Sequence, residues 1–240
     1  TGLKNILMTD IVAIIPARGG SKGILNKNII DFCGKPLIAW TIEQCLSSKY
    51  ISDVWVTSDS QEILNIAEKY GAKTIKRPDS ISGDLASSEA AWMHAIEIIQ
   101  RDSKIDLVFA PQVTSPLREI QDIDNAIELF QREKYDSMFS SSIVEDLFFW
   151  KKDKEHKLQS VNYDYLNRQR RQDIQEKIIE NGSFYIFKSE IIKKYNNRLG
   201  GKIGHSQMEF WKVFEIDNLE DVRICSTLMR QLLIKIMEIK

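Results

Sequence analysis

Cysteine is scarce in this sequence of 240 residues, and the few cysteines form no pattern. Cys33, Cys45 and Cys225 have neither the spacing of metal ligands nor that of a disulfide framework. Such use of cysteine is typical of a reducing compartment, so we expect a cytoplasmic protein. No apolar run approaches the length of a membrane-spanning helix, and we recognise no signal peptide, so we expect no association with a membrane.

An excess of charge of one sign is also missing. The sequence has 33 Lys and Arg residues against 34 Asp and Glu residues, which leaves a formal net charge of −1. A nearly neutral chain has no overall field that would draw it to nucleic acid or to an anionic membrane. We therefore expect no nucleic-acid partner, and basic residues matter for function only where they cluster.

Several well-known motifs do not occur. The glycine-rich stretch that starts at residue 18 has neither the spacing of a Walker A loop nor the Gly-x-Gly-x-x-Gly of dinucleotide-binding folds. His94, His156 and His205 lie outside any nucleophile signature, which gives little support to a serine or cysteine hydrolase. We find no repeat and no low-complexity linker, and the length suits one large α/β domain.

What is present is a loop suited to an anion, directly after an apolar run. Residues 11–15 form an unbroken apolar run, typical of a buried strand in a parallel sheet, and Pro16 ends it. In the loop that follows, glycines without a Cβ allow backbone N–H groups to approach a phosphate closely. These are Gly19, Gly20 and Gly23, and the basic residues beside them are Arg18, Lys22 and Lys27. The alternative is an ordinary glycine turn with solvated basic side chains.

Strand and helix patterns alternate along the chain. We expect strands at 11–15, 53–57, 73–76, 107–110, 137–143, 182–187 and 213–217. Helices are expected at 36–46, 61–70, 88–101, 120–134 and 218–235, with N-caps from residues 58–60, from Ser87 or Ser88, and from Asn218. This alternation predicts parallel βαβ units covered by helices on both faces, a doubly wound α/β fold.

In such sheets, ligands bind beyond the carboxyl ends of the strands. Three polar loops follow expected strands: residues 18–27, Asp59 and residues 112–118. We therefore expect these loops to open on the same side of the sheet and to form a site there.

A pair of carboxylates stands near the C-terminal helix. Glu215 and Asp217 are two residues apart on an expected strand, so both side chains point to one face. Adjacent carboxylates repel each other unless a cation lies between them, and Mg²⁺ prefers one or two carboxylates together with phosphate oxygens. With the anion loop, the pair predicts a Mg²⁺–nucleotide site. The alternative is a solvated strand end before a helix.

The pattern changes between residues 144 and 175. The aromatic run 148–150 is followed by a strongly charged run at 151–157, which we interpret as a solvated face. The aromatic residues beside it suggest a segment that packs on a second subunit.

These motifs together resemble those of the acylneuraminate cytidylyltransferases, the CMP-sialic acid synthetases. The resemblance extends over nearly the whole chain and is carried by residues 16–23 with 27–28, 77–78, 86–88, 112–118, 171–173, 181–185 and 215–217. It implies a single nucleotidyltransferase domain over residues 1–240, with a Rossmann-like, mostly parallel sheet and a dimerising excursion at 144–180. It also implies a reaction in which the anomeric hydroxyl of a nine-carbon 2-keto acid sugar attacks the α-phosphate of CTP.

The resemblance implies roles for individual residues. The nucleotide would be held by Arg18, Gly19, Ser21, Lys22, Lys27, Asn28, Arg77 and Ser88. The sugar would be held by Gln112, Thr114, Ser115, Arg171 and Tyr185, with Arg171 on the sugar carboxylate, across a homodimer or within one chain. Mg²⁺ would be held by Glu215 and Asp217. Lys27, Arg18 and Asp217 would be catalytic, and Lys27 would steady the transferring phosphate.

The sequence departs from the family pattern at a few positions. Glu215 stands where the family usually has Asp and is one methylene longer. Residues 24–26 and Val113 occupy positions where proline is common.

Three alternatives to this reading stay open. A 3-deoxy-manno-octulosonate cytidylyltransferase would tend to place an Asp ligand within residues 112–115. A sugar-1-phosphate nucleotidylyltransferase would have a longer first loop. A non-catalytic nucleotide-binding protein would bind CTP without releasing pyrophosphate.

Overall fold

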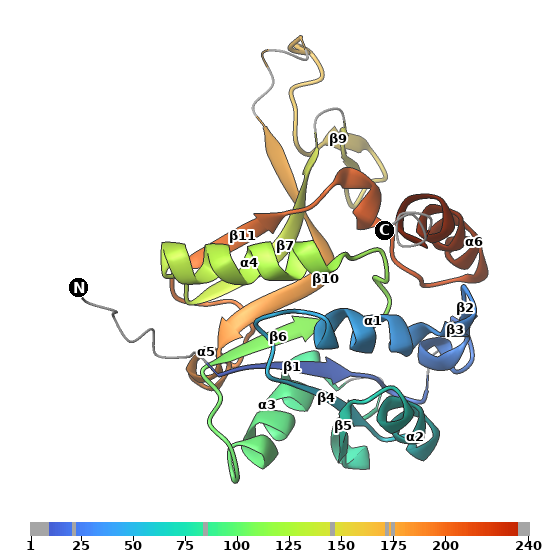
Figure 1. Cartoon of the computed structure of the whole chain (residues 1–240). Coiled ribbons are helices and arrows are strands. Elements are labelled where there is room, and N and C mark those ends of the chain that lie inside the picture. Colours follow the sequence, from blue (N-terminus) through green and yellow to red (C-terminus); the bar gives the residue numbers. More distant parts are fainter. Residues whose placement is uncertain are drawn as a thin grey trace.

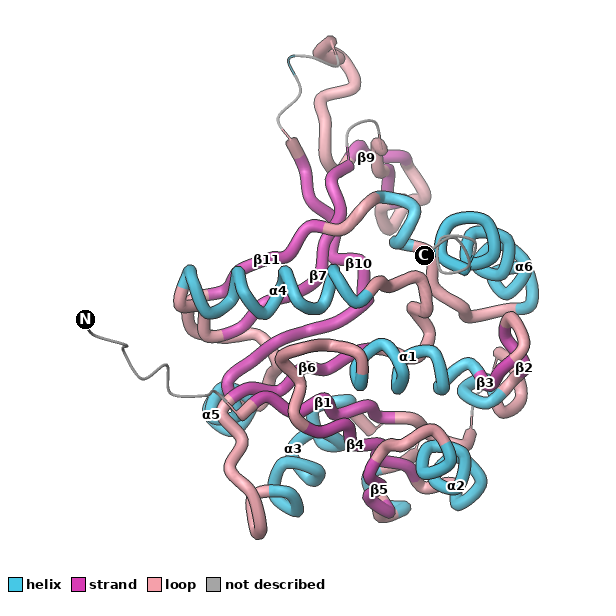
Figure 2. The backbone as a smooth tube through the Cα atoms, in the orientation of Figure 1, coloured by secondary structure: helices cyan, strands magenta, loops and turns pink. Residues whose placement is uncertain are grey.

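A computed structural model describes residues 10–20, 23–83, 86–144, 147–170, 173 and 176–234. Its centre is a seven-stranded sheet with the strand order β11-β7-β10-β6-β1-β4-β5 (Figures 1 and 2). The strands are β1 (Ile11–Pro16), β4 (Asp53–Ser58), β5 (Lys73–Lys76), β6 (Leu107–Pro111), β7 (Ser137–Val144), β10 (Lys177–Lys188) and β11 (Ile203–Gln207). β10 runs antiparallel to β6 and β7, and the other neighbours in this sheet are parallel. The predicted mostly parallel α/β fold is confirmed.

The apolar run of β1 is buried because the strand has neighbours on both edges and helices on both faces. Ile11, Ala13 and Ile15 belong to one hydrophobic cluster, and Val12 and Ile14 belong to another. Successive side chains of a strand point to opposite faces, so an unbroken apolar run supplies two cores at once.

The helices divide between these two cores. They are α1 (Leu37–Leu46), α2 (Gln61–Lys69), α3 (Ser88–Ile99), α4 (Ile120–Glu133), α5 (Ser189–Tyr195) and α6 (Leu219–Leu228), which continues as a π-helical turn over Met229–Ile234. Buried residues of α1, α2, α4 and α6 join one cluster, whereas those of α3 and α5 join the other. No helix among the described residues is long and apolar enough to cross a membrane.

The predicted N-caps are confirmed. Ser60 accepts a hydrogen bond from the backbone N–H of Ile63, and Ser87 accepts one from Ala90. Asn218 caps α6 in a reciprocal box with Asp221. Side-chain oxygens at these positions satisfy N–H groups that have no partner within the helix, which is why the starts of these helices could be predicted.

The prediction of a strand at 213–217 is wrong. The chain instead forms a 3₁₀ turn, η4 (Phe210–Val213), and then an unpaired extended segment. The N–H of Ile216 donates to the carbonyl oxygen of Thr114 at 2.7 Å, which ties the segment to a loop and not to a strand. Within this segment Ile216 is buried, while Phe214, Glu215 and Asp217 are exposed.

Several short elements were not predicted. They are β11, α5, a small hairpin of β2 (Asp31–Phe32) and β3 (Lys35–Pro36), and a second hairpin of β8 (Trp150–Lys152) and β9 (Leu158–Ser160). The second hairpin belongs to a part of the chain that projects from the sheet beyond the ends of β7 and β10 (Figure 1).

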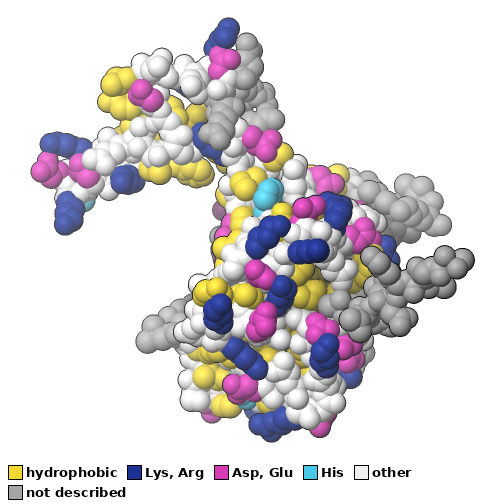
Figure 3. Space-filling view, turned by 90° about the vertical axis from the view of Figure 1, so that its left-hand side faces the viewer, with side chains coloured by type: hydrophobic (Ala, Val, Ile, Leu, Met, Phe, Trp, Pro, Cys, Tyr) yellow, Lys and Arg dark blue, Asp and Glu magenta, His cyan; other side chains and the backbone are white. Residues whose placement is uncertain are grey.

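This projection, which we call the arm and define as residues 147–170, carries apolar side chains in the open. Large exposed hydrophobic residues gather on it, as Figure 3 shows: Leu147, Phe149, Trp150, Leu158, Val161, Tyr165 and Leu166. The charged run at 151–157 is solvated, as predicted, with Asp153 less exposed than its neighbours.

Candidate active site

A cavity of about 630 Å³ opens beyond the carboxyl ends of β1, β5 and β6. Its lining includes many of the residues singled out from the sequence: Arg18, Lys27, Asn28, Arg77, Ser88, Gln112, Thr114 and Asp217. The loops after β1 and β6 therefore open on the same side of the sheet, as the parallel topology predicts.

The loop after β1 is held in place by two polar contacts. The backbone N–H of Gly19 donates to Oδ1 of Asp59 at 3.0 Å. The amide Nδ2 of Asn28 donates to the carbonyl oxygen of Arg18 at 2.9 Å, and Asn28 is itself buried. Asn28 therefore braces this loop from within, and the N–H of Gly19 already has a partner inside the protein.

Lys27 and Asp217 meet at the cavity although 190 residues separate them. The Nζ of Lys27 lies 2.8 Å from Oδ1 of Asp217, with 16% of the lysine side chain and 65% of the aspartate side chain exposed. Lys27 begins a 3₁₀ turn directly after Asn26, whose φ of 54° is left-handed and is tolerated better by asparagine than by most residues. A partly solvated ion pair contributes little to stability. Both side chains can therefore change partner and bind a ligand at low cost in stability.

Gly23 allows the loop after β1 to pass directly beside Asp217. A Cβ at position 23 would lie 2.4 Å from the backbone oxygen of Asp217, which is closer than such atoms can approach. Glycine is therefore required here for close approach of two backbones, at the point where the loop meets the carboxylate segment.

Arg77 presents a buried guanidinium to the cavity. The residue is 6% exposed, and its Nε and Nη2 have no hydrogen-bond partner among the described residues. Burial lowers the pKa of Arg77, and the charge of Arg18 acts in the same direction, whereas Asp59, 3.8 Å from Nη2, opposes the shift. Buried donors without partners are costly, so this side chain is suited to an acceptor supplied by a ligand.

Glu215 and Asp217 concentrate negative charge at this end of the molecule. Burial, and then the neighbouring charge of Asp217, raise the pKa of the Glu215 carboxyl, while Lys27 acts in the opposite direction. Two neighbouring carboxylates with a single lysine beside them fit the ligand set that Mg²⁺ prefers. Asp217 lines the cavity and Glu215 does not, so Asp217 is placed better to meet a bound phosphate.

Two of the expected sugar contacts lie away from the cavity lining. Ser115 is 2% exposed, and its Oγ donates to the carbonyl oxygen of Gly182 at 3.5 Å. Tyr185 is 5% exposed and donates to the carboxylate of Glu180, and burial raises the pKa of the tyrosine. The remaining expected site residues, Ser21, Lys22 and Arg171, lie outside the described residues.

Two contributions to the site escaped the sequence analysis. Asp59 was expected at this edge of the sheet, but its contacts with Gly19 and Arg77 were not. Trp92 lines the cavity, and its Nε1 donates to the carbonyl oxygen of Ile14 at 3.2 Å. Trp92 lies four residues after Ser88 and hence on the same face of α3, which is the signal that could have revealed it.

Known proteins resemble this chain in sequence and in fold. Residues 12–232 match the family model described as Cytidylyltransferase. N-acylneuraminate cytidylyltransferase A of Danio rerio is 37% identical over 202 residues, which cover 83% of this chain and 46% of the relative. Pseudaminic acid cytidylyltransferase of Campylobacter jejuni is 44% identical over 136 residues, which cover 56% of this chain and 59% of the relative. The chain thus spans about half the length of these curated relatives.

Among solved structures, CMP:2-keto-3-deoxy-manno-octonic acid synthetase complexed with CTP superposes with a TM-score of 0.71, covering 94% of this chain and 100% of that one. At 14% sequence identity, this likeness concerns the fold alone. The family match runs from β1 into the π-helical turn after α6 and includes each loop that lines the cavity. The chain therefore belongs to the cytidylyltransferase family.

Proposed function

We propose that this chain transfers CMP from CTP to a nine-carbon 2-keto acid sugar and releases pyrophosphate. The anomeric oxygen of the sugar forms a bond to the α-phosphorus, and the bond from that phosphorus to pyrophosphate breaks. The observation that carries the proposal is the convergence of Lys27, Arg77 and Asp217 on one cavity from loops far apart in the sequence. Cationic donors beside a carboxylate suit a nucleoside triphosphate that arrives with a metal ion.

The nucleotide side of the proposal rests on charge placement. Phosphoryl transfer needs positioning and charge neutralisation more than covalent help. Arg18 and Lys27 bind the triphosphate, and Lys27 stabilises the charge that develops on the transferring phosphate. Arg77 and Ser88 contact the nucleoside, where the guanidinium of Arg77, which has two donor nitrogens without a hydrogen bond to the described residues, finds acceptors. Gly19, Ser21, Lys22 and Asn28 complete this set as the family resemblance implies.

Mg²⁺ is the cofactor in this proposal, held by Asp217 with Glu215. The raised pKa of Glu215 supports it, because the shift comes from burial and from the neighbouring carboxylate and a divalent cation would relieve both. When bound, Mg²⁺ neutralises charge on the phosphate oxygens. The protein's own part is to hold Asp217 and Lys27 at one end of the cavity, with Glu215 two residues from Asp217.

The sugar side involves Gln112 and Thr114, which line the cavity, with Ser115, Tyr185 and Arg171 as further expected contacts. Relatives named for N-acylneuraminate and for pseudaminic acid support a nine-carbon acid over the eight-carbon alternative. The eight-carbon enzyme is similar in fold, at 14% identity.

A homodimer, a single nucleotidyltransferase domain with an excursion at 144–180, and a cytoplasmic location complete the proposal. The exposed apolar side chains of the arm support a dimer contact, because such patches are usually covered by a partner. The three cysteines are free thiols, which suits a reducing compartment.

The test is pyrophosphate release from CTP and Mg²⁺ with a panel of eight- and nine-carbon 2-keto acid sugars. We expect release with a nine-carbon acid. Release with the eight-carbon acid alone would move the protein to the alternative enzyme. CTP binding without release across the whole panel would favour a nucleotide-binding protein without catalysis.

A further inference from the structure

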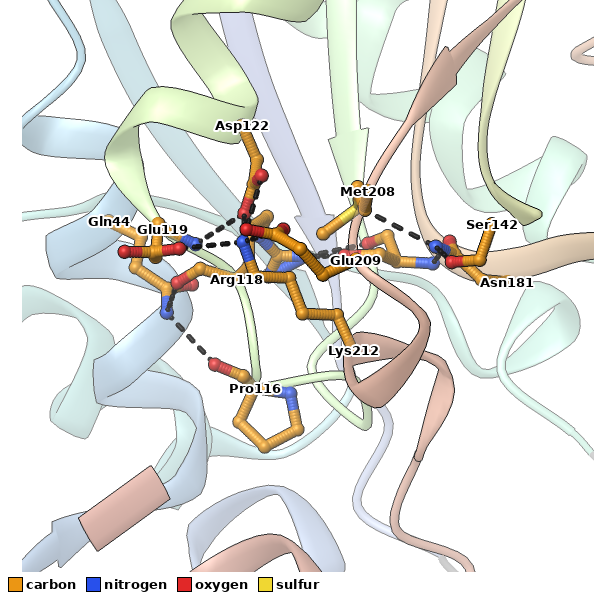
Figure 4. Close-up of polar contacts among 11 residues, drawn as sticks. Gln44, Pro116, Arg118, Glu119, Asp122, Ser142, Asn181, Met208, Glu209 and Lys212 are labelled. Carbon is orange, nitrogen blue, oxygen red and sulfur yellow. Dashed lines mark hydrogen bonds and ion pairs between the residues drawn. The ribbon is translucent and has the colours of Figure 1, made fainter. Parts of the chain in front are cut away.

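Lys212 is a buried lysine with three carboxylates around its ammonium. It lies on η4 and its side chain is 1% exposed. Nζ lies 2.6 Å from Oε2 of Glu119, 2.8 Å from Oδ2 of Asp122 and 2.6 Å from Oε2 of Glu209. Figure 4 shows these side chains pointing toward one another from two parts of the chain, the start of α4 and the turn η4.

The three carboxylates by themselves have the spacing of a metal site. One oxygen from each of Glu119, Asp122 and Glu209 falls within 4.8 Å of the others. The ammonium of Lys212, however, stands within hydrogen-bond distance of all three and takes the place a cation would need. An ammonium has three N–H donors, so each carboxylate can receive one. The lysine side chain therefore occupies the place of a bound cation. Its ion pairs join two segments of the chain.

The segments that it joins are each continuous with one that lines the candidate active-site cavity. Glu119 caps α4 and Asp122 lies in its first turn, directly after the loop that holds Gln112 and Thr114. Lys212 lies five residues before Asp217. The buried ion cluster therefore ties the start of α4 to the turn that leads into the carboxylate segment.

The contacts beyond Lys212 continue to the cavity. The N–H of Ile216 donates to the carbonyl oxygen of Thr114 at 2.7 Å, so the two segments meet again there. The backbone oxygen of Asp217 lies beside Gly23, and its carboxylate contacts Lys27. A shift of the turn at Lys212 would therefore move Asp217 relative to both Thr114 and Lys27.

The turn is also fixed at its other end. The N–H of Met208 donates to the carbonyl oxygen of Ser141 on β7 at 2.8 Å. The Nδ2 of Asn181 on β10 contacts the sulfur of Met208 at 3.6 Å, as Figure 4 shows. Between Met208 and Ile216, the buried ion pairs of Lys212 hold the chain against the start of α4.

We propose that Lys212 is a positioning residue that holds the Glu215–Asp217 segment against the loop of Gln112 and Thr114. The relevance of this segment to catalysis rests on the proposed function. The tether itself does not, so the two can be tested separately. Lys212 does not line the cavity and acts through Asp217.

The experiment compares Lys212→Met with Lys212→Arg and a control, Lys188→Met. Lys188 also forms an ion pair, with Asp136, and lies at the end of β10, outside the cavity lining. The first readout is amide hydrogen exchange of residues 213–218 in the protein without ligands. The second is the Mg²⁺ concentration that gives half-maximal pyrophosphate release.

We expect Lys212→Met to speed exchange at residues 213–218 at least about tenfold, because three unpaired carboxylates repel one another and release the turn. The Mg²⁺ requirement should rise by a similar factor. Lys212→Arg keeps the charge, so its exchange rate at residues 213–218 and its Mg²⁺ requirement should lie between those of Lys212→Met and the wild type. Lys188→Met should leave both readouts near wild type.

Unchanged exchange at residues 213–218 in a folded Lys212→Met protein would overturn the proposal, as would an equal change in Lys188→Met. If Lys212→Met does not fold, Asp122→Asn takes its place. It leaves Lys212 with Glu119 and Glu209, and we expect faster exchange at 213–218; unchanged exchange would again overturn the proposal. Absence of CTP turnover in the wild type would refute the proposed function. The exchange measurement would still show whether Lys212 holds the segment 213–218 in place.

Discussion

Lys27 combines a partly solvated ion pair with a place at the cavity, and this combination separates its effect on catalysis from its effect on stability. Lys27→Ala removes one charge from a pair in which Asp217 is 65% exposed, so unfolding free energy should change by less than about 1 kcal/mol. Turnover should fall roughly 10²-fold or more, because a charge aimed at the transferring phosphate is lost. Steady-state kinetics and thermal unfolding measure the two effects.

A matched control for this prediction is Lys104→Ala. Lys104 also pairs with an aspartate, Asp106, but its side chain is 71% exposed and does not line the cavity. Its removal should leave turnover unchanged. Equal turnover in wild type and Lys27→Ala would remove Lys27 from the mechanism.

The cysteine thiols provide a prediction that is independent of function. Burial raises the pKa of Cys45 and of Cys225 to about 12, and burial also raises the pKa of Cys33. The reactive form is the thiolate, whose fraction at neutral pH falls as the pKa rises. Iodoacetamide should therefore spare Cys45 and Cys225 in the native protein and modify Cys33 slowly.

Mass spectrometry of the alkylated protein checks this expectation. All three cysteines should react once the protein is unfolded in denaturant, which serves as the positive control. Rapid labelling of Cys45 or Cys225 in the native protein would show that the hydrophobic cluster shared by α1 and α6 opens readily.

Among the elements, the loop after β1 depends on a glycine for its contact with the carboxylate segment. Gly23→Ala places a Cβ 2.4 Å from the backbone oxygen of Asp217, so the loop must move away. We expect kcat/KM to fall at least about tenfold, because an error of about 1 Å in catalytic geometry can have such an effect. Gly20→Ala is the matched control, since a Cβ at position 20 meets nothing within 4 Å.

Wild-type kinetics in Gly23→Ala would mean that close packing against Asp217 is dispensable. A larger loss in Gly20→Ala than in Gly23→Ala would point instead to loop flexibility as the property that matters.

Elements with a local signature could be predicted, and those without one could not. The start of α2 follows from Ser60 and the start of α3 from Ser87, because a cap acts within three residues. β11 carries no apolar alternation, since its buried positions are Gly204 and Ser206. Gly204 is buried because the ring of Tyr135 packs where a Cβ would stand, and no pattern in the sequence indicates that contact.

The error at residues 213–217 has a similar cause. An alternating apolar and acidic pattern is typical of a strand, but a strand needs a free neighbouring edge. Here the preceding turn is drawn to α4 by Lys212, and Ile216 meets the loop carbonyl of Thr114 instead of a sheet. A single lysine gives no sign in the sequence that it will be buried.

At the scale of the whole molecule, the arm leaves apolar side chains without cover. Leu158 is 64% exposed and Leu166 is 81% exposed. We expect Leu158→Glu with Leu166→Glu to convert a homodimer into a folded monomer, because charge is strongly disfavoured in the core of such an interface. Sedimentation velocity measures the change, and circular dichroism confirms that the protein stays folded.

Leu46→Glu is the control for the arm, since Leu46 is exposed on α1, away from the arm. It should leave the sedimentation coefficient unchanged. A wild type that sediments as a monomer at micromolar concentration would contradict the dimer part of the proposal, while the prediction for Lys27 would be unaffected.

The sequence by itself determined the alternation of strands and helices, the caps and the family. These depend on neighbouring residues, or on motifs whose order along the chain is visible directly. The tertiary structure decided which residues line the cavity, that Ser115 bonds to Gly182 inside the protein, and that Lys212 joins α4 to the carboxylate segment. Such contacts depend on how loops far apart in the chain come together when the sheet forms, and burial and charge pairing act across that distance.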